Sequence, residues 1–152
     1  MSDLSTPKHG LHGGFSLTQE DVEKFLAITK KVKPKKGKVF QSKKKVANKE
    51  YRDVDGYYSE AEEEELYKIL QSVALKINEH FKYKLDGIEK AQVMKYQAPS
   101  NGYGWHIDMG AEGISANRKI GVSILLNNDY EGGELSFRTG EETKTVKPDT
   151  GE

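Results

Sequence analysis

The sequence changes its hydrophobic repeat near Gly87, and this change limits the fold more than any other feature. Before it, apolar residues recur at spacings of three and four, which is typical of amphipathic helices. After it, apolar and polar residues alternate, which is typical of strands with one face inward. Helices followed by closely spaced strands predict an α+β arrangement, with the helices on one face of a sandwich or barrel.

Two helices are predicted in the first half of the chain. The first follows Thr18, a residue suited to capping, and ends before Pro34. For the second, Ser59 is the predicted cap, with Glu62 as its capping-box partner and Phe81 at the far end. The apolar faces comprise Val22, Phe25, Leu26 and Thr29 in the first helix, and Leu66, Ile69, Leu70, Val73 and Ile77 in the second.

Four strands are predicted after the change in repeat. Residues 119–126 give the strongest pattern, because Ile120, Val122, Ile124 and Leu126 share one face. The other strands span residues 91–96, 134–137 and 143–146, with turn-forming residues between them.

Length and composition predict one domain over residues 15–152, preceded by a flexible tail over residues 1–14. The absence of cysteine excludes disulfides, thiolate metal sites and a cysteine nucleophile within the chain. No apolar run reaches membrane-spanning length, and the N-terminal residues lack the hydrophobic core of a signal peptide. These features predict a cytoplasmic protein with no membrane partner.

A lysine-rich stretch spans residues 30–49, with ten lysines and no acidic residue. One interpretation is a surface for nucleic acid or an acidic peptide. The other is a solvated loop or edge strand. Only Phe40 interrupts the lysines with an aromatic ring, and the 24 basic and 24 acidic residues of the chain balance. We therefore favour the solvated loop or edge strand and expect no nucleic-acid partner.

The stretch from Tyr103 to Asp108 contains the strongest candidate for chemistry. His106 and Asp108 are two residues apart, so in an extended chain their side chains leave the same face and can converge on one point. An imidazole and a carboxylate make two corners of a metal site. Two ligands are too few to hold a metal tightly, so a third must come from elsewhere.

Flanking motifs give this stretch a family resemblance. They are Gln92-Val93-Met94-Lys95-Tyr96, the stretch Tyr103 to Asp108, Arg118-Lys119 before a strand, and Asp129 to Leu135 with its Tyr-Glu-Gly-Gly-Glu-Leu. In this order they resemble the Fe(II)- and 2-oxoglutarate-dependent dioxygenases, specifically the prolyl 4-hydroxylase type with its bacterial and phage members. The resemblance covers roughly residues 14–152 and is strongest from Gln92 onward.

The resemblance implies a double-stranded β-helix, or jelly roll, supported by N-terminal helices. It implies a facial triad of two histidines and a carboxylate around Fe(II), with His106 and Asp108 as two ligands. It also implies O2 and 2-oxoglutarate as cosubstrates, possible use of ascorbate, and Tyr96 as a contact of the 2-oxoglutarate carboxylate. Arg118 stands where relatives contact substrate. Tyr103 and Trp105 either wall the site or pack in the core.

The family pattern is incomplete in these 152 residues. The second histidine ligand and a later basic residue for 2-oxoglutarate are expected after Glu152, together with the remaining C-terminal strands. None of His9, His12 and His80 stands at the family's position for that ligand. A truncated sequence, a fragment completed by a partner and a degenerate protein are the alternatives. We expect the 152 residues alone to be weakly active or inactive.

Three functions remain open from the sequence. The first is hydroxylation of a prolyl residue in a peptide or protein substrate. The second is the same oxygenase chemistry on another residue or a small molecule, because loops decide the substrate. The third is a non-catalytic jelly-roll module that binds through residues 30–49.

Overall fold

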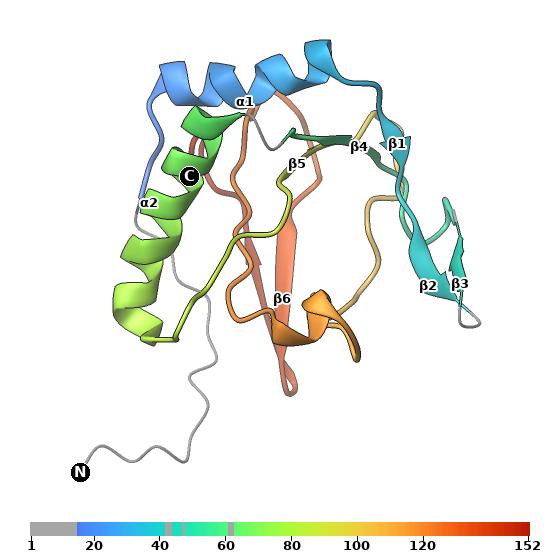
Figure 1. Cartoon of the computed structure of the whole chain (residues 1–152). Helices are drawn as coiled ribbons and strands as arrows, with labels where there is room; N and C mark the ends of the chain where they lie inside the picture. Colours follow the sequence, from blue (N-terminus) through green and yellow to red (C-terminus); the bar gives the residue numbers. More distant parts are fainter. Residues whose placement is uncertain (1–14, 42–43, 47, 61–62) are drawn as a thin grey trace.

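The computed structural model describes residues 15–41, 44–46, 48–60 and 63–152 (Figure 1). The predicted tail over residues 1–14 and the predicted capping residue Glu62 therefore lie outside the described residues. The helices are α1 (Gln19–Lys31), α2 (Glu64–Phe81) and the short 3-10 helix η1 (Ile114–Asn117). The strands are β1 (Lys35–Lys36), β2 (Val39–Gln41), β3 (Lys44–Val46), β4 (Asp55–Tyr58), β5 (Gln92–Lys95), β6 (Leu135–Thr139) and β7 (Glu142–Val146).

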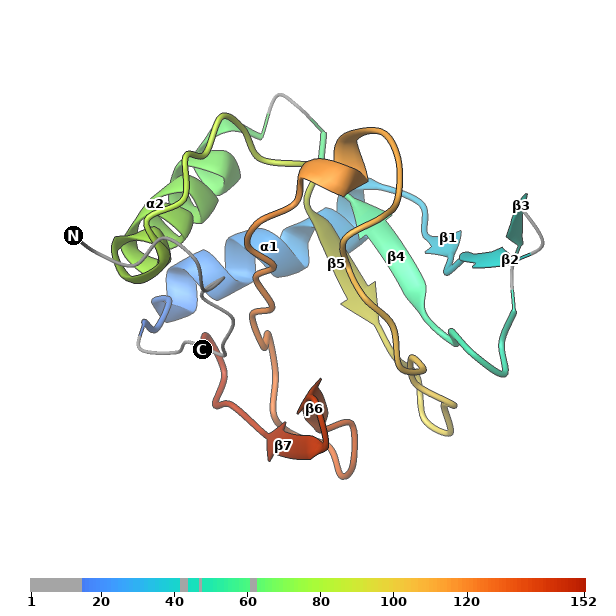
Figure 2. The ribbon, with the colours of Figure 1, turned by 90° about the horizontal axis from the view of Figure 1, so that it is seen from below.

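These strands form three small antiparallel sheets. The largest has the order β1-β4-β5, while β2-β3 and β6-β7 are two-stranded. Helix α1 crosses one side of the β4-β5 pair, and the β6-β7 hairpin lies away from this helix (Figure 2). The described residues thus combine helices with small sheets, and the double-stranded β-helix stays a prediction.

Helix α1 begins and ends as its sequence predicts. Thr18 accepts a hydrogen bond from the backbone of Asp21 at 3.2 Å, and the helix stops at Lys31 before Pro34. Its buried residues are Val22, Phe25 and Ile28. The prediction that Leu26 lies on this face is wrong. Leu26 is exposed, and Ile28 is the residue of this turn that faces the core.

The core lies where α1, α2 and the largest sheet meet. Phe25, Ile28, Leu66 and Val93 form the buried cluster. Around it pack the partly buried side chains of Leu17, Val32, Tyr57, Ile69, Leu70 and Leu126. The predicted stripe of α2 is confirmed in this cluster and by the burial of Val73 and Ile77.

Ser59 does not cap α2 as predicted. The helix begins at Glu64, and Ser59 directly follows β4 with a fully buried side chain. Its hydroxyl hydrogen-bonds the Tyr67 hydroxyl at 2.7 Å and donates to the Ala91 carbonyl at 3.2 Å. Burial explains the difference, because a hydroxyl removed from water requires partners and here finds them on α2 and before β5.

Residues 119–126 do not form the predicted strand. Leu125 donates its backbone N–H to Glu152 at 2.9 Å and accepts from Gly151 at 2.7 Å. The rest of the segment has no backbone partner within the part of the chain that the structure describes. An alternating pattern gives a segment one apolar face. A strand also requires backbone hydrogen bonds to a neighbouring strand. The predicted strands near β5, β6 and β7 are confirmed with shifted ends.

Within the described ranges, no helix is sufficiently long and apolar to cross a bilayer.

The buried hydroxyl pair provides a test of the packing between β4 and α2. Ser59→Ala is expected to lower the free energy of unfolding by about 1–2 kcal/mol, because Tyr67 loses a buried partner. Urea unfolding of Ser59→Ala, Tyr67→Phe and the double variant measures the coupling. Ser136→Ala, which removes an exposed hydroxyl on β6, is the control and should change stability by less than about 0.5 kcal/mol. Fully additive losses at the two positions would contradict the assigned contact.

Candidate metal and ligand site

Two backbone hydrogen bonds hold the loop that carries the candidate site. Asp53 donates its N–H to the Gly102 carbonyl at 2.8 Å, and Gly104 donates to the Tyr51 carbonyl at 2.7 Å. The residues between these bonds form an antiparallel bridge pair. The backbone is therefore fixed two residues before His106.

Gly104 is required by the close packing of Tyr51. A Cβ at residue 104 would lie 2.7 Å from Tyr51 Cε2, which is closer than carbon atoms approach. The Tyr51 hydroxyl also donates to the backbone carbonyl of Trp105. One aromatic side chain thus contacts two successive residues of the loop and sets its path.

The His106 ring is held at one nitrogen and on one face. Nδ1 lies 2.7 Å from the Gly104 carbonyl oxygen, and the ring stacks on Tyr103 at 3.7 Å between centroids and 16° between planes. The Arg52 guanidinium lies over the same Tyr103 ring at 4.4 Å. Because a carbonyl only accepts, Nδ1 carries the proton in this contact, and the neutral ring has its lone pair on Nε2.

Nε2 faces the carboxylate that the sequence predicted. It lies 3.2 Å from Asp108 Oδ1, so the structure brings the two side chains together. Two lone pairs at this distance repel each other unless a proton or another cation lies with them. The arrangement therefore suits either an imidazolium–carboxylate ion pair or a shared metal ion.

The separation fits two adjacent ligands of one metal ion. Metal bonds to imidazole nitrogen and carboxylate oxygen are about 2.0–2.2 Å long, so ligands at right angles are about 3 Å apart. The Nδ1 contact to a backbone carbonyl is the usual partner of a metal-bound histidine. Among the described residues, no group of three or more His, Asp and Glu side chains could hold a metal. His106 and Asp108 could therefore supply two ligands, and a third is not among the described residues.

Arg118 holds the backbone of Asp108. Its guanidinium makes two hydrogen bonds to Glu89, at 2.5 and 2.6 Å, and a third to the Asp108 carbonyl at 2.5 Å. The bond from Arg118 holds the pKa of Glu89 below its usual value, against a smaller effect of burial. The predicted contact of Arg118 with substrate stays a prediction, and the structure gives the side chain a positioning role.

Of the two predicted tyrosines, Tyr103 stacks on the histidine and Tyr96 lies near Arg52. Burial raises the pKa of both Tyr96 and Tyr103, and the nearby Arg52 charge opposes this rise. Both phenols are therefore neutral at physiological pH. The Tyr96 hydroxyl lies 4.0 Å from Met94 Sδ. Tyr96 does not line the cavity beside the loop.

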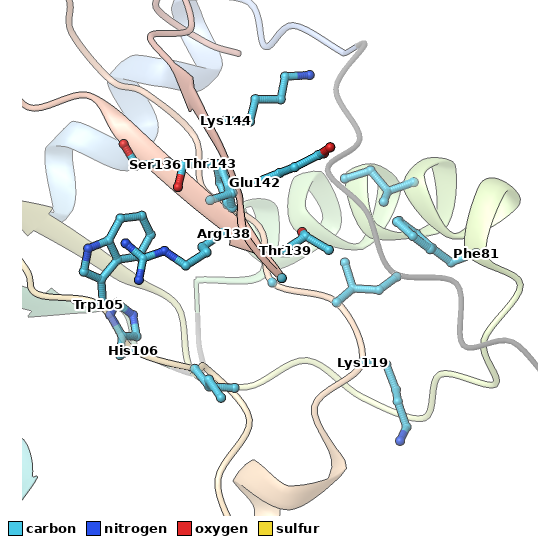
Figure 3. A pocket seen from close by; sticks show the side chains of 16 residues that line it. Phe81, Trp105, His106, Lys119, Ser136, Arg138, Thr139, Glu142, Thr143 and Lys144 are labelled. Atoms are coloured by element: carbon cyan, nitrogen blue, oxygen red, sulfur yellow. The ribbon is translucent and has the colours of Figure 1, made fainter.

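A cavity of about 930 Å3 opens beside the loop (Figure 3). Trp105 and His106 line one side of it, and the β6-β7 hairpin lines another. Besides Trp105, five of its lining side chains are large and apolar, namely Ile77, Phe81, Ile107, Ile120 and Phe137. Its charged side chains are Lys119, Arg138, Glu142 and Lys144. The volume falls in the range of small-ligand sites, about 300–1,000 Å3.

Sequence reasoning found the loop residues but missed their supports. Arg52 contacts Tyr103, and Glu89 contacts Arg118. Arg138 contacts Trp105. Each contact joins segments far apart in the chain, so no local spacing could reveal it. A single arginine beside a single aromatic residue has no signature until the fold brings them together.

The lysine-rich stretch is partly paired within the fold. Lys31 lies 2.9 Å from Glu63, and Lys36 pairs with Asp55 across the β1-β4 register. Lys35 lies over the Tyr58 ring at 5.4 Å. The short strand β1 is at the edge of its sheet, as one of the two interpretations of this stretch predicted.

Comparison with protein-family models, with curated proteins and with solved structures found no match for this chain.

Substitution of Gly104 tests whether Tyr51 sets the loop. Gly104→Ala is expected to cost about 1–3 kcal/mol of unfolding free energy, because the added methyl group overlaps the Tyr51 ring. Urea unfolding followed by Trp105 fluorescence measures both stability and loop environment. Gly87→Ala, where no atom lies within 4 Å of the new Cβ, is the control. A loss no larger than that of the control would contradict the packing argument.

The Glu89–Arg118 pair predicts a pH dependence. Since the pKa of Glu89 is lower in the folded chain, its contribution is present above its ordinary value of 4.5 and disappears as the pH falls through the lowered value. Glu89→Gln is therefore expected to cost up to about 1 kcal/mol at pH 7, because the pair is partly exposed. The difference in unfolding free energy between Glu89→Gln and the unsubstituted chain should disappear at acidic pH. Chemical unfolding between pH 3 and 7 measures this difference, and Glu79→Gln is the charge control. A difference in unfolding free energy that does not change with pH would contradict the Glu89–Arg118 pair.

Proposed function

We propose that the loop around His106 and Asp108 binds Fe(II) and that the protein is a 2-oxoglutarate-dependent dioxygenase of the prolyl 4-hydroxylase type. The observation that supports this proposal is the 3.2 Å separation of Nε2 and Oδ1, with Nδ1 occupied by a backbone carbonyl. A histidine and a carboxylate in this relation are two of the three ligands of a non-haem iron site.

The surrounding residues favour a metal ion over a simple ion pair. The Asp108 side chain is 69% exposed and that of His106 is 33% exposed, so an ion pair between them gains little in water. Yet both residues are held in place: His106 by Tyr103 and Gly104, and Asp108 by Arg118 through its backbone. Fixed ligands with open access suit a metal that must also bind small molecules.

Four residues of the loop have a task in the proposed reaction. When bound, iron with 2-oxoglutarate and O2 supplies the oxidising power for hydroxylation of a C–H bond, while 2-oxoglutarate becomes succinate and carbon dioxide. His106 and Asp108 would hold the iron. Trp105 and Ile107 line the adjoining cavity, where they would orient the substrate and exclude water.

The proposed substrate is a prolyl residue of a peptide or protein, following the motif resemblance. The cavity is consistent with an extended or bulky substrate, because it is open and about 930 Å3 in volume. Five large apolar side chains on its walls would contact a pyrrolidine ring or another apolar group equally well. The substrate class therefore rests on the sequence motifs.

Metal binding tests the proposal directly. Anaerobic titration with Fe(II), and in parallel with Co(II), is expected to show one site, which His106→Ala and Asp108→Ala weaken at least about tenfold. His80→Ala, which removes a histidine of α2, should leave the affinity unchanged. Isothermal titration calorimetry measures all four proteins.

The same titrations test the cosubstrate. 2-Oxoglutarate should tighten metal binding to the unsubstituted chain, since ligands of a common site are thermodynamically linked, whereas glutarate lacks the keto oxygen and should not. Equal metal affinity in His106→Ala and the unsubstituted chain would refute the iron site. Metal binding without any effect of 2-oxoglutarate would refute the oxygenase class while leaving the metal site in place.

A further inference from the structure

We infer that Arg138 is the anion-recognition residue of the cavity and that the ligand bound there carries a carboxylate group. This inference rests on the proposed function only for the identity of that ligand. The carboxylate belongs either to a small dicarboxylate such as 2-oxoglutarate or to an acidic side chain of a peptide substrate, and separate titrations distinguish the two sources.

Arg138 is placed by its strand and by one aromatic ring. It lies on β6, opposite Thr143 of β7, and its guanidinium carbon is 4.4 Å from the centroid of the Trp105 ring. Arg138, Trp105 and the adjacent His106 all line the same cavity (Figure 3). The cation is therefore held on the hairpin side of the cavity, against Trp105, which precedes the candidate metal ligand His106 in the chain.

The contact with Trp105 leaves N–H donors of the Arg138 guanidinium available. Arginine has five N–H donors, and one aromatic ring does not occupy all of them. Arg138 has no ion-pair partner within 4.0 Å among the residues that the structure describes. Arg118, by contrast, already uses three of its five N–H donors on Glu89 and the Asp108 carbonyl. Arg52 and Arg118 also lie near the loop, but neither lines the cavity, so Arg138 is the arginine placed to donate to a ligand there.

The charges of the cavity also favour an anion. Lys119 and Lys144 line it together with Arg138, and Glu142 is the one carboxylate among its lining residues in the described part of the chain. The large apolar side chains that line the cavity would contact the remainder of the ligand. The expected ligand thus combines an apolar portion with a carboxylate, which a planar guanidinium binds through two parallel hydrogen bonds.

The single tryptophan makes this inference measurable without any metal. Trp105 is the only tryptophan of the chain and lies against Arg138, so a ligand on Arg138 should change its fluorescence. The full 152-residue chain is titrated in EDTA with 2-oxoglutarate in one arm. The second arm uses a short proline-containing peptide with a glutamate, together with the same peptide carrying glutamine instead. Calorimetry provides an independent measure of each affinity.

We expect a saturable change in at least one arm, weakened about tenfold or more in Arg138→Gln, because a charge-assisted hydrogen bond is lost. Arg138→Lys should bind with intermediate affinity, since it keeps the charge but loses the planar fork. Lys147→Gln is the matched control. It removes a cation that lies over Tyr130 and outside the cavity lining, and should not alter binding. Circular dichroism confirms that each variant is folded.

The outcomes separate this inference from the proposed function. Saturation by 2-oxoglutarate assigns the carboxylate to the cosubstrate, and saturation by the glutamate peptide alone assigns it to the substrate. Absence of binding in both arms, or equal binding by Arg138→Gln, would overturn the inference. Neither result depends on iron, so the metal titrations of His106→Ala test the proposed function separately.

Discussion

The pair of backbone hydrogen bonds between residues 51–53 and 102–104 is the constraint on which the site depends. It joins the segment before β4 to the loop after β5, so the largest sheet continues in effect into the candidate site. Backbone bonds of this kind fix position without regard to side-chain chemistry. The side chains of the loop are thereby left available for function.

Side-chain contacts then orient the two candidate ligands on the fixed loop. Tyr103 holds the face of His106, and the Gly104 carbonyl selects which of its nitrogens is free. From the other direction, Arg118 holds the Asp108 backbone and is itself held by Glu89. Both groups are thus oriented by neighbours that do not enter the cavity, which is how proteins usually orient metal ligands.

Features that depend on near neighbours in the chain were predictable. The cap at Thr18, the stripe of α2, the β6-β7 hairpin and the convergence of His106 with Asp108 all follow from spacings of two to four residues. Features that depend on distant partners were not. Residues 119–126 have a strand pattern without a ladder, and Ser59 has a capping residue's chemistry in a buried position. The prolyl hydroxylase family and its jelly roll stay predictions.

The contact between Tyr51 and Gly104 links the composition of two distant positions. A side chain at residue 104 is incompatible with the aromatic ring at residue 51 as it is placed, and the Tyr51 hydroxyl is bonded to the next carbonyl of the loop. A substitution at either position therefore requires a compensating substitution at the other. In homologous sequences that keep this loop, a residue larger than glycine at 104 should coincide with a smaller residue at 51, so the two columns of an alignment should covary.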